Sequence, residues 1–341
     1  MLLRSWNCSG IRLFVFLINF TNLGMKDSRN IRESFFYSIL NYIKMTYSNL
    51  LQAIGNTPMI KLDKILNNKN INLYAKLEGQ NPGGSIKDRV AIYMIEQAEK
   101  RGELKQGKII LEATSGNMGI SLAMVGAQKG YKVHIVMSES MSKERKIMLK
   151  ELGAKLILTD KKLGTKGAIC KAKELAKNYP LLYWFSDQFN NKDNIQAHYH
   201  GIASEILNEV PNIDYLVAGI GTSGTIMGVA NRFKKDFCKT KIIGVFPPAG
   251  YKIQGLQNPQ KDFSGEIYND SLIDEHFHVS KEEAFVMTRK VAAKEGLFVG
   301  MSSGAVLFAA SQTGKSLKTK NIVVILPDRG EKYLSTELFR Y

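Results

Sequence analysis

The sequence has little cysteine, tryptophan or proline. Its 341 residues include three cysteines, two tryptophans and eight prolines. The cysteines, Cys8, Cys170 and Cys238, lie far apart and form no C-x-x-C pair. A disulfide framework needs an even set of cysteines, and a zinc finger needs closely spaced ones. The pattern therefore excludes both and predicts a protein of the reducing cytoplasm.

Long hydrophobic runs are absent as well. No stretch of 18 apolar residues is free of charged residues. A helix needs about 20 predominantly apolar residues to cross a bilayer. We therefore expect no spanning helix and no membrane partner.

Residues 1–44 differ in composition from the rest of the chain. Arg4 and Arg12 accompany a short apolar stretch from Ile11 to Phe20, and a polar mixture follows. The stretch resembles a weak signal peptide, but no clean cleavage site of small residues follows it. Because arginine outnumbers acidic residues there, a transit peptide stays open as an alternative. We interpret residues 1–44 as an N-terminal extension, disordered or outside the fold, before a natural start at Met45.

Acidic residues are too few to balance the basic ones. The 47 Lys and Arg exceed the 31 Asp and Glu by 16. The lysines are spread along the chain, without an RGG run or another nucleic-acid-binding signature, so we expect no nucleic-acid partner. The excess charge is consistent with solvated lysines or with a general attraction for small anions.

Histidine occurs only five times. His134 falls in a predicted strand, and His198 and His200 are expected at the start of a helix. None pairs with cysteine or an acidic residue at metal-ligand spacing. We therefore predict structural roles for the histidines and no metal site.

From about Leu73 onward, short apolar runs alternate with amphipathic segments of helical length. The predicted strands are Leu73–Leu77, Ile109–Glu112, Val133–Met137, Lys155–Leu158, Tyr215–Ala218, Ile242–Phe246 and Ile322–Leu326. The predicted helices are Ser85–Arg101, Asn117–Lys129 and Lys143–Leu152. Strands separated by helices indicate βαβ units, so we predict an α/β fold with mostly parallel sheet.

Three glycine-containing turns each follow a predicted strand and precede a predicted helix. In open parallel sheets such turns lie where ligands bind. The first turn runs from Asn81 to Arg89 and contains Lys87. With Ser85 as the N-cap, Lys87 falls in the first helical turn, where the helix dipole disfavours a cation. A lysine whose charged form is disfavoured forms imines with carbonyl groups, whereas the alternative is an ordinary surface lysine.

The other two turns have the composition of anion sites. Glu112–Gly119 offers backbone N–H groups and hydroxyls at a helix start, for a phosphate or a carboxylate, or it is a plain helix cap. Gly219–Thr225 combines glycine, threonine and serine as phosphate-binding loops do. It matches G-x-G-x-x-G, but its late position and the lack of an acidic residue about twenty positions on argue against a dinucleotide.

Taken together, the motifs resemble those of the cysteine synthase (O-acetylserine sulfhydrylase) family. The shared segments are Gly55–Pro58, Lys76–Glu78, Asn81–Arg89, Thr114–Asn117, Gly221–Thr225 and Met301–Ala305. The B type of the family is resembled most closely at Lys76–Gly79, Glu112–Ser115, Asp187–Asn191 and Asp328–Thr336. The family belongs to the fold type II enzymes of pyridoxal 5'-phosphate (PLP), which are tryptophan synthase β-like.

The resemblance implies a fold and a role for each matching residue. It implies two open, twisted, mostly parallel sheets flanked by helices, with PLP in a cleft between two domains. We place these at 45–191, whose first strands are free to pack on the other domain, and 192–341, because the polar cluster Asn190–Asn194 predicts a loop. Lys87 is then the Schiff-base lysine and proton shuttle. The other implied PLP contacts are Asn117 to the ring hydroxyl, Gly221, Thr222, Ser223, Gly224 and Thr225 to the phosphate, and Ser302 to the pyridine nitrogen.

The implied substrate contacts are Thr114, Ser115 and Gln188, which bind the carboxylate, together with Met118. Met118 stands where the family usually has threonine, so only its backbone N–H serves. Gln257 occupies the place of a B-type arginine that favours thiosulfate, while Tyr251–Gly255 resembles the A type. The sulfur donor, sulfide or thiosulfate, is therefore open.

The implied activity is the replacement of the acetate of O-acetyl-L-serine by sulfide, through an aminoacrylate, to give L-cysteine. Ser302 agrees with it, because a neutral hydroxyl does not keep the pyridine nitrogen protonated as a carboxylate does, which favours β-elimination. The resemblance also implies a homodimer. The alternatives are a cystathionine β-synthase, a serine or threonine dehydratase, and a cysteine-pathway regulatory partner without activity.

Overall fold

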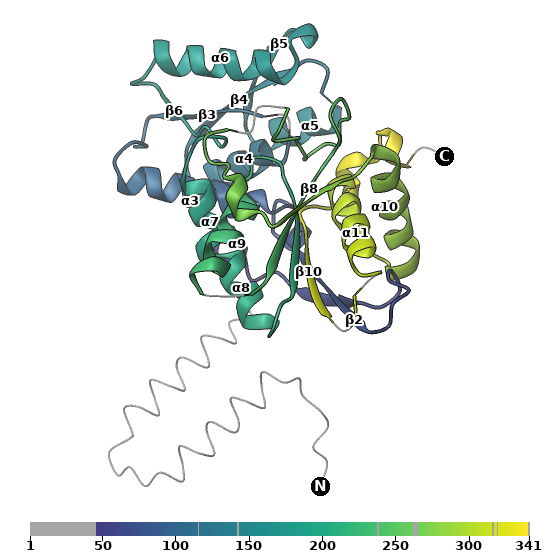
Figure 1. The fold of residues 1–341 in the computed structure, drawn as a ribbon. Coiled ribbons are helices and arrows are strands. Elements are labelled where there is room, and N and C mark those ends of the chain that lie inside the picture. Colours follow the sequence, from purple (N-terminus) through teal and green to yellow (C-terminus); the bar gives the residue numbers. More distant parts are fainter. Residues whose placement is uncertain are drawn as a thin grey trace, which may run out of the picture. The chain divides into compact units, whose positions relative to one another are not determined.

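The computed structural model describes residues 46–339 except 115, 142, 237–238, 262–264, 316 and 319. The predicted extension at residues 1–44 therefore lies outside the described residues. From Asn49 onward the chain forms one compact unit, which contains two β-sheets and their covering helices (Figure 1).

The larger sheet has six strands within the described residues, in the order β1-β2-β10-β7-β8-β9. Only β1 runs antiparallel to its neighbour β2, and the other neighbours are parallel. The strands are β1 (Met59–Leu62), β2 (Ile71–Leu77), β7 (Tyr215–Gly219), β8 (Lys241–Phe246), β9 (Glu275–His278) and β10 (Lys320–Leu326).

The smaller sheet, as far as the structure describes the chain, has four parallel strands in the order β5-β4-β3-β6. They are β3 (Ile109–Ala113), β4 (Lys132–Ser138), β5 (Lys155–Thr159) and β6 (Tyr183–Phe185). Because β1 and β2 precede β3 in sequence but pair in the larger sheet, the chain crosses between the sheets early and returns after β6.

Helices cover both faces of the larger sheet. On one face α10 (Lys281–Glu295) and α11 (Met301–Thr313) lie side by side (Figure 1). The other face packs against α8 (Ile202–Glu209) and α9 (Gly224–Lys235). Successive side chains of β10 therefore enter different cores: Val324 packs with α10 and α11, and Val323 with α8 and α9. Burial on both sides explains why this strand is almost wholly apolar.

The smaller sheet is covered in the same way. Its helices are α3 (Lys87–Lys100), α4 (Asn117–Lys129) and α5 (Lys143–Glu151) on one face and α6 (Gly164–Asn178) on the other. A further helix, α7 (Asp193–His200), packs against both α3 and α9 and so joins the two halves. The short 3-10 segments are η1 (Leu50–Ala53), η2 (Glu78–Gln80), η3 (Lys161–Leu163), η4 (Asp270–Leu272), η5 (Gly330–Tyr333) and η6 (Glu337–Phe339).

The structure confirms the predicted α/β fold with two mostly parallel sheets, and all seven predicted strands are present. It also adds β1, β6 and β9. The domain boundary at residue 191 stays a prediction.

Two local predictions were wrong. The first predicted helix starts at Lys87 with Ile86 at the N-cap, although Ser85 Oγ still accepts a hydrogen bond from Lys87 N–H at 3.3 Å. His198 and His200 lie in the last turn of α7, not at a helix start.

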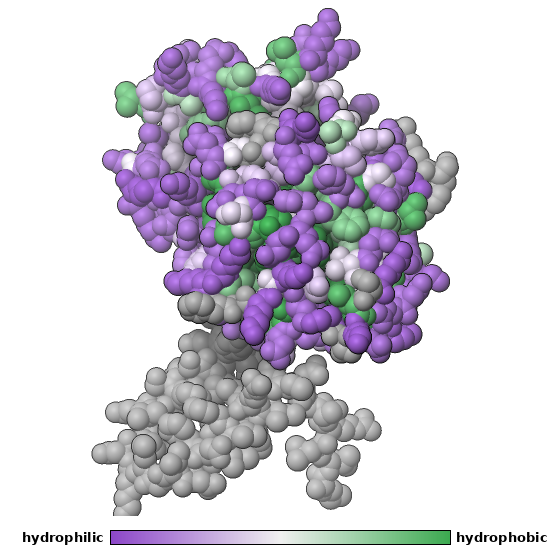
Figure 2. All heavy atoms as spheres, in the orientation of Figure 1, coloured by the Kyte–Doolittle hydropathy of each residue, from purple (hydrophilic) through white to green (hydrophobic). Residues whose placement is uncertain are grey.

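The surface is dominated by polar residues. On the face shown in Figure 2, hydrophilic side chains cover most of the described part and hydrophobic ones form small separate patches. Within residues 46–339, none of the helices combines the length and the apolar character that crossing a bilayer requires.

Candidate active site

A cavity of about 1170 Å³ lies at the carboxyl ends of the parallel strands. Its walls come from the segments that follow β3, β4, β5, β6, β7, β8 and β10, and from the starts of α3 and α11. In parallel α/β sheets the strand ends leave backbone N–H groups and helix N-termini facing a common crevice, so this is where a ligand is expected. Both sheets contribute to the same cavity.

Lys87 opens α3 and faces this cavity. Its Nζ lies 3.1 Å from Thr222 Oγ1, in the loop after β7. Burial lowers the pKa of Lys87 to about 8, and the negative charge of Glu112 opposes part of that shift. Desolvation disfavours the ammonium form, so a usable fraction of the amine is unprotonated near neutral pH. The side chain therefore meets the requirement for a nucleophilic lysine.

A buried ion cluster fixes the helix that carries Lys87. Arg89 is 5% exposed, and its guanidinium reaches Glu78 and Glu205, each at 2.6 Å. Glu78 also accepts a hydrogen bond from the Thr57 hydroxyl at 2.6 Å. The Gly55–Pro58 and Lys76–Glu78 motifs thus hold the start of α3 rather than line the cavity.

The glycine-rich loop from Gly219 to Thr225 connects β7 to α9. A Cβ at Gly221 would lie 2.5 Å from the carbonyl oxygen of Gly255, so only glycine fits there. Ser223 precedes α9 with a φ of 73°, and its Oγ is buried without a hydrogen-bond partner among the described residues. A hydroxyl and the first N–H groups of a helix, both lacking acceptors, suit a phosphate.

Two side chains from α7 support this loop. Asn194 Nδ2 donates to Thr222 Oγ1 at 3.0 Å and to the carbonyl oxygen of Gln188 at 2.8 Å. Its side chain occupies the space that a Cβ at Gly224 would need. His198 Nε2 lies 3.2 Å from Thr225 Oγ1, and burial holds the pKa of His198 well below its usual value. His198 is thus a neutral residue that supports the loop, and the structural role expected from the sequence stays a prediction.

The loop between β3 and α4 forms the facing wall. Thr114 accepts a hydrogen bond from Gly116 N–H at 3.2 Å and lines the cavity, as do Asn117 and Met118. Met118 is 1% exposed as a residue, and its side chain packs in the core between α4 and the smaller sheet. Ser115, predicted to bind substrate, lies outside the described residues.

Glu112 sits under this wall on β3 and is 1% exposed. Its carboxylate accepts hydrogen bonds from Ser186 Oγ at 2.5 Å and from Gln188 N–H at 3.3 Å, and Gln188 Nε2 lies 3.4 Å away. Burial raises the pKa of Glu112 to about 7, and those hydrogen bonds limit the rise. Glu112 therefore fixes Gln188, whose side chain lines the cavity. This role of Glu112 was not predicted from the sequence.

A hydrogen-bond network formed by the segment after β10 was also not predicted from the sequence. Asn117 Nδ2 donates to Asp328 Oδ2 at 2.7 Å, and Lys332 Nζ donates to Asn117 Oδ1 at 2.9 Å. Tyr333 donates its hydroxyl proton to the same Asp328 oxygen at 2.6 Å. Burial raises the pKa of Asp328 and lowers that of Lys332, while each opposes the shift of the other. The signal available in the sequence was a polar cluster directly after a buried strand.

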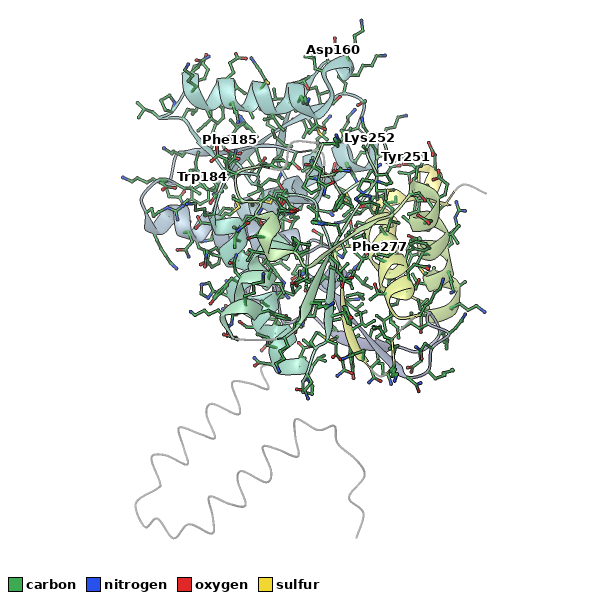
Figure 3. The ribbon with its side chains drawn as sticks, in the orientation of Figure 1. Asp160, Trp184, Phe185, Tyr251, Lys252 and Phe277 are labelled. Carbon is green, nitrogen blue, oxygen red and sulfur yellow. The ribbon has the colours of Figure 1, made fainter. Side chains whose placement is uncertain are left out.

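The cavity lining is strongly basic. Asp328 is its one acidic residue among those the structure describes. Tyr251 and Lys252, labelled in Figure 3, contribute from the segment between β8 and β9. The further basic residues of the lining, besides Lys87 and Lys332, are Arg145, Lys161, Lys162, Lys166 and Lys261. Such a lining attracts small anions.

The cavity brings together most of the residues predicted from sequence. Those that line it are Lys87, Thr114, Asn117, Met118, Gln188, Gly221, Thr222, Ser223, Thr225 and Ser302. Gly224 lies behind the lining as the first residue of α9. Ser302 enters in the first turn of α11, whose N-cap is Gly300. Among residues 46–339 as described, no cluster of three His, Cys, Asp or Glu suited to a metal occurs.

Known proteins are similar to this chain in sequence and architecture. Residues 50–328 match the family of pyridoxal-phosphate dependent enzymes. A cysteine synthase of Aquifex aeolicus is 43% identical over 299 residues, covering 85% of this chain and 91% of that protein. Cysteine synthase B of Escherichia coli is 41% identical, covering 86% and 96%. The crystal structure of a cysteine synthase from Entamoeba histolytica is 38% identical, with a TM-score of 0.83 over 88% of this chain and 92% of that one.

The fold and the cavity define a PLP-dependent α/β enzyme. With these relatives, the chain belongs to the cysteine synthase family of PLP-dependent enzymes, which confirms the resemblance found in the sequence.

The residues present fit the cofactor that this family uses. PLP needs an amine that reacts with its aldehyde and a cradle for its phosphate. Lys87, with its lowered pKa, supplies the amine, and the loop around the unpartnered Ser223 hydroxyl supplies the cradle. Because Lys87 Nζ and Thr222 Oγ1 lie 3.1 Å apart, both requirements meet within one cavity.

Proposed function

We propose that the protein is a cysteine synthase that converts O-acetyl-L-serine and sulfide to L-cysteine and acetate. The observation that carries this proposal is the contact of Lys87 with the glycine-rich loop, in a cavity that Thr114 and Gln188 also line. The names of the relatives support the choice of substrate.

On the cofactor side, we assign Lys87 as the residue that holds PLP covalently. The loop from Gly221 to Thr225 binds the phosphate with its N–H groups and hydroxyls. Ser302 meets the pyridine nitrogen with a neutral hydroxyl, and Asn117 donates to the ring hydroxyl. Bound PLP withdraws electrons from the α-carbon of the substrate, which makes the proton there removable.

On the substrate side, Thr114, Ser115 and the Met118 N–H bind the carboxylate together with Gln188. This fixes the amino acid with its α-proton toward Lys87. With its amine free, Lys87 would take that proton, and acetate would leave Cβ with the bonding electron pair. Hydrosulfide adds to Cβ, and the Lys87 ammonium returns the proton to the α-carbon. Atoms and charge balance, because one anion enters and one leaves.

The basic lining supports an anionic second substrate. Hydrosulfide and acetate are both anions, and the lysines of the cavity lining raise their local concentration. The same charge draws in thiosulfate, so electrostatics alone does not select the donor. We propose sulfide as the preferred donor because Gln257 stands at the position in the cavity lining where B-type enzymes have an arginine.

The decisive test compares wild-type protein with Lys87→Ala. Wild-type holoenzyme should give a borohydride-trapped PLP adduct on the peptide that contains Lys87, and should form cysteine from O-acetyl-L-serine and sulfide. Lys87→Ala should lose the adduct and at least about 1000-fold of the turnover. Lys252→Ala, which removes another lysine of the cavity lining, serves as the control and should retain the adduct. An adduct on a different lysine would refute the assignment.

A substrate screen separates this function from its alternatives. Purified enzyme is given O-acetyl-L-serine or serine with sulfide, thiosulfate, homocysteine or water, and the products are measured. We expect cysteine from O-acetyl-L-serine and sulfide as the main product. Cystathionine from serine, or pyruvate, as the main product would show a different member of the class. We further propose that the enzyme is a homodimer of the cytoplasm, which sedimentation and fractionation of cells test directly.

A further inference from the structure

The side-chain amide of Asn117 is held at both ends. Its Nδ2 donates one hydrogen to Asp328 at 2.7 Å, and its Oδ1 accepts one from Lys332 at 2.9 Å. A reversed amide would point its NH₂ group at an ammonium and its oxygen at a carboxylate. Both contacts would then be repulsive, so the chemistry of the two partners fixes the orientation.

The two partners are themselves held in place. Lys332 Nζ also donates to the carbonyl oxygens of Gly83 at 3.0 Å and Gly84 at 3.2 Å, so its three hydrogens are all used. Asp328 is 2% exposed and receives the Tyr333 hydroxyl in addition to Asn117. Both residues lie on the segment after β10, whereas Asn117 begins α4 beside the smaller sheet.

Among the described residues, this arrangement leaves one hydrogen of Asn117 Nδ2 without an acceptor. An amide nitrogen carries two hydrogens, and Asp328 takes one of them. Asn117 lines the cavity, so the second hydrogen has the cavity within reach. Rotation of the amide about its last side-chain bond would break both contacts, so the direction of this hydrogen is set before a ligand arrives.

We propose that Asp328 and Lys332 are positioning residues that direct the second Nδ2 hydrogen of Asn117 at the ring hydroxyl oxygen of PLP. The inference rests on the proposed placement of the cofactor. A hydrogen bond to that oxygen stabilises its ionised form over its neutral form. The two forms of the lysine-bound cofactor differ in absorption, so their ratio reports on the hydrogen bond independently of turnover.

The test is a double-mutant cycle read by the absorption spectrum of the holoenzyme. Asp328→Ala and Asn117→Ala should each lower the ratio of ionised to neutral ring hydroxyl about tenfold, the size expected for one hydrogen bond. In the Asn117→Ala background, adding Asp328→Ala should change the ratio by less than about threefold, because the residue then has nothing to position. Lys332→Met should behave as Asp328→Ala does, and Lys332→Arg should restore part of the ratio.

Three results would overturn the inference while leaving the proposed function intact. Asp328→Ala could shift the ratio tenfold in both backgrounds, which would mean that it acts on the cofactor directly. It could also leave the ratio unchanged in both, or Lys332→Arg could fail to recover more than Lys332→Met. A wild-type spectrum without lysine-bound PLP would instead refute the proposed function together with the inference.

Two further variants keep the test sound. If Asp328→Ala does not fold, Asp328→Asn replaces it, with an expected change of about threefold because a weaker acceptor remains. Asp214→Ala is the matched control. Asp214 pairs with Lys320 and Asn321 N–H before β7, outside the cavity lining. Its loss should leave the spectrum unchanged.

Discussion

The two sheets supply the cavity with different kinds of groups. The larger sheet contributes the glycine-rich loop after β7, the Asp328–Tyr333 segment after β10 and, through β2 and η2, the lysine at the start of α3. The smaller sheet contributes the loop after β3 and Gln188 after β6. The first set suits a phosphate and an aldehyde, and the second suits an amino-acid carboxylate.

The supports of the two walls differ as well. The glycine-rich loop is held by close backbone packing and by the neutral side chains Asn194 and His198. The substrate wall rests on the buried carboxyl of Glu112, whose pKa of about 7 lies inside the physiological range. Asn117 is where the walls meet, since it belongs to one and is tied to the other. Cofactor binding and substrate binding should therefore be separable by mutation.

The largest separation of cofactor binding from substrate binding is expected from a substitution at Gly221. In Gly221→Ala, the new Cβ would lie 2.5 Å from the Gly255 carbonyl oxygen, a backbone atom that cannot move aside cheaply. Strain of this kind costs about 1–3 kcal/mol, so PLP should bind roughly 10- to 100-fold more weakly. Titration of apo-protein with PLP, followed by absorbance, measures this change.

Gly116→Ala is the matched control on the opposite wall. Apart from its two chain neighbours, no described residue has an atom within 4 Å of a Cβ placed there, so PLP affinity should stay within about twofold of wild type. Equal losses of affinity in the two variants would contradict the division of labour between the walls.

Whether a strand could be predicted from the sequence depends on its place in the sheet. The predicted strands have apolar runs because most are buried on both faces. The three missed strands, β1, β6 and β9, all lie at sheet edges and are short, and β9 reads Glu-His-Phe-His. An edge strand has less apolar surface to bury, so its sequence carries a weaker signal.

The candidate site likewise has a part that could be predicted from the sequence and a part that could not. Lys87 and the glycine-rich loop were predictable because each belongs to a local turn whose composition indicates its chemistry. The contacts of Asn117 join residues 211 and 215 positions apart in the sequence. Those segments are brought together by contacts between positions distant in the sequence, such as the β2–β10 pairing and the bridge between Ser85 and Asp328. Their composition alone therefore could not reveal the network.

A second prediction concerns pH and the two titratable groups of the walls. Glu112 has a pKa of about 7 in the folded protein, above its usual 4.5, so folding favours its protonated form. The free energy of unfolding should therefore fall by about 3 kcal/mol as pH rises from about 4.5 to about 7. Glu112→Gln should remove this part of the fall, as urea titrations of apo-protein at about pH 5 and about pH 7.5 would measure.

Lys87 should act in the opposite direction in a separate range. Its pKa is lowered from 10.5 to about 8, so the stability it contributes is present above pH 10.5 and is lost as pH falls through 8. Lys87→Met should remove the pH dependence of the free energy of unfolding between about pH 8 and about pH 10.5, and leave the lower range unchanged.

Glu151→Gln, at an exposed position on α5, is the control for Glu112→Gln. A slope that is the same in wild type and Glu112→Gln would place the buried charge elsewhere.

A smaller effect is expected from Thr114→Val, which removes a hydroxyl from the substrate wall with little change in volume. A hydrogen bond to a charged group is worth about 1.5–3 kcal/mol, so KM for O-acetyl-L-serine should rise by roughly tenfold or more. PLP affinity should change less than about twofold. Thr159→Val, on β5 of the same sheet and outside the cavity lining, should leave KM unchanged. A loss of PLP from Thr114→Val would show that the walls are not independent.

The last prediction concerns Gln257, which lines the cavity near its basic residues. Its Oε1 is buried without a hydrogen-bond partner among the described residues, and its backbone N–H is fixed to the Ile220 carbonyl oxygen at 2.8 Å. Thiosulfate carries two charges and gains more than hydrosulfide does from a cation at this position. A charge-assisted contact is worth about 1.5–3 kcal/mol. We therefore expect wild-type enzyme to use sulfide at least about tenfold more efficiently than thiosulfate, and Gln257→Arg to narrow that ratio.

Gln257→Met keeps the length without a charge and should leave the ratio as it is. Steady-state kcat/KM with both donors decides the question. Equal values in wild type would mean that Lys252 and Lys261, which line the same cavity, already supply the charge that Gln257 lacks.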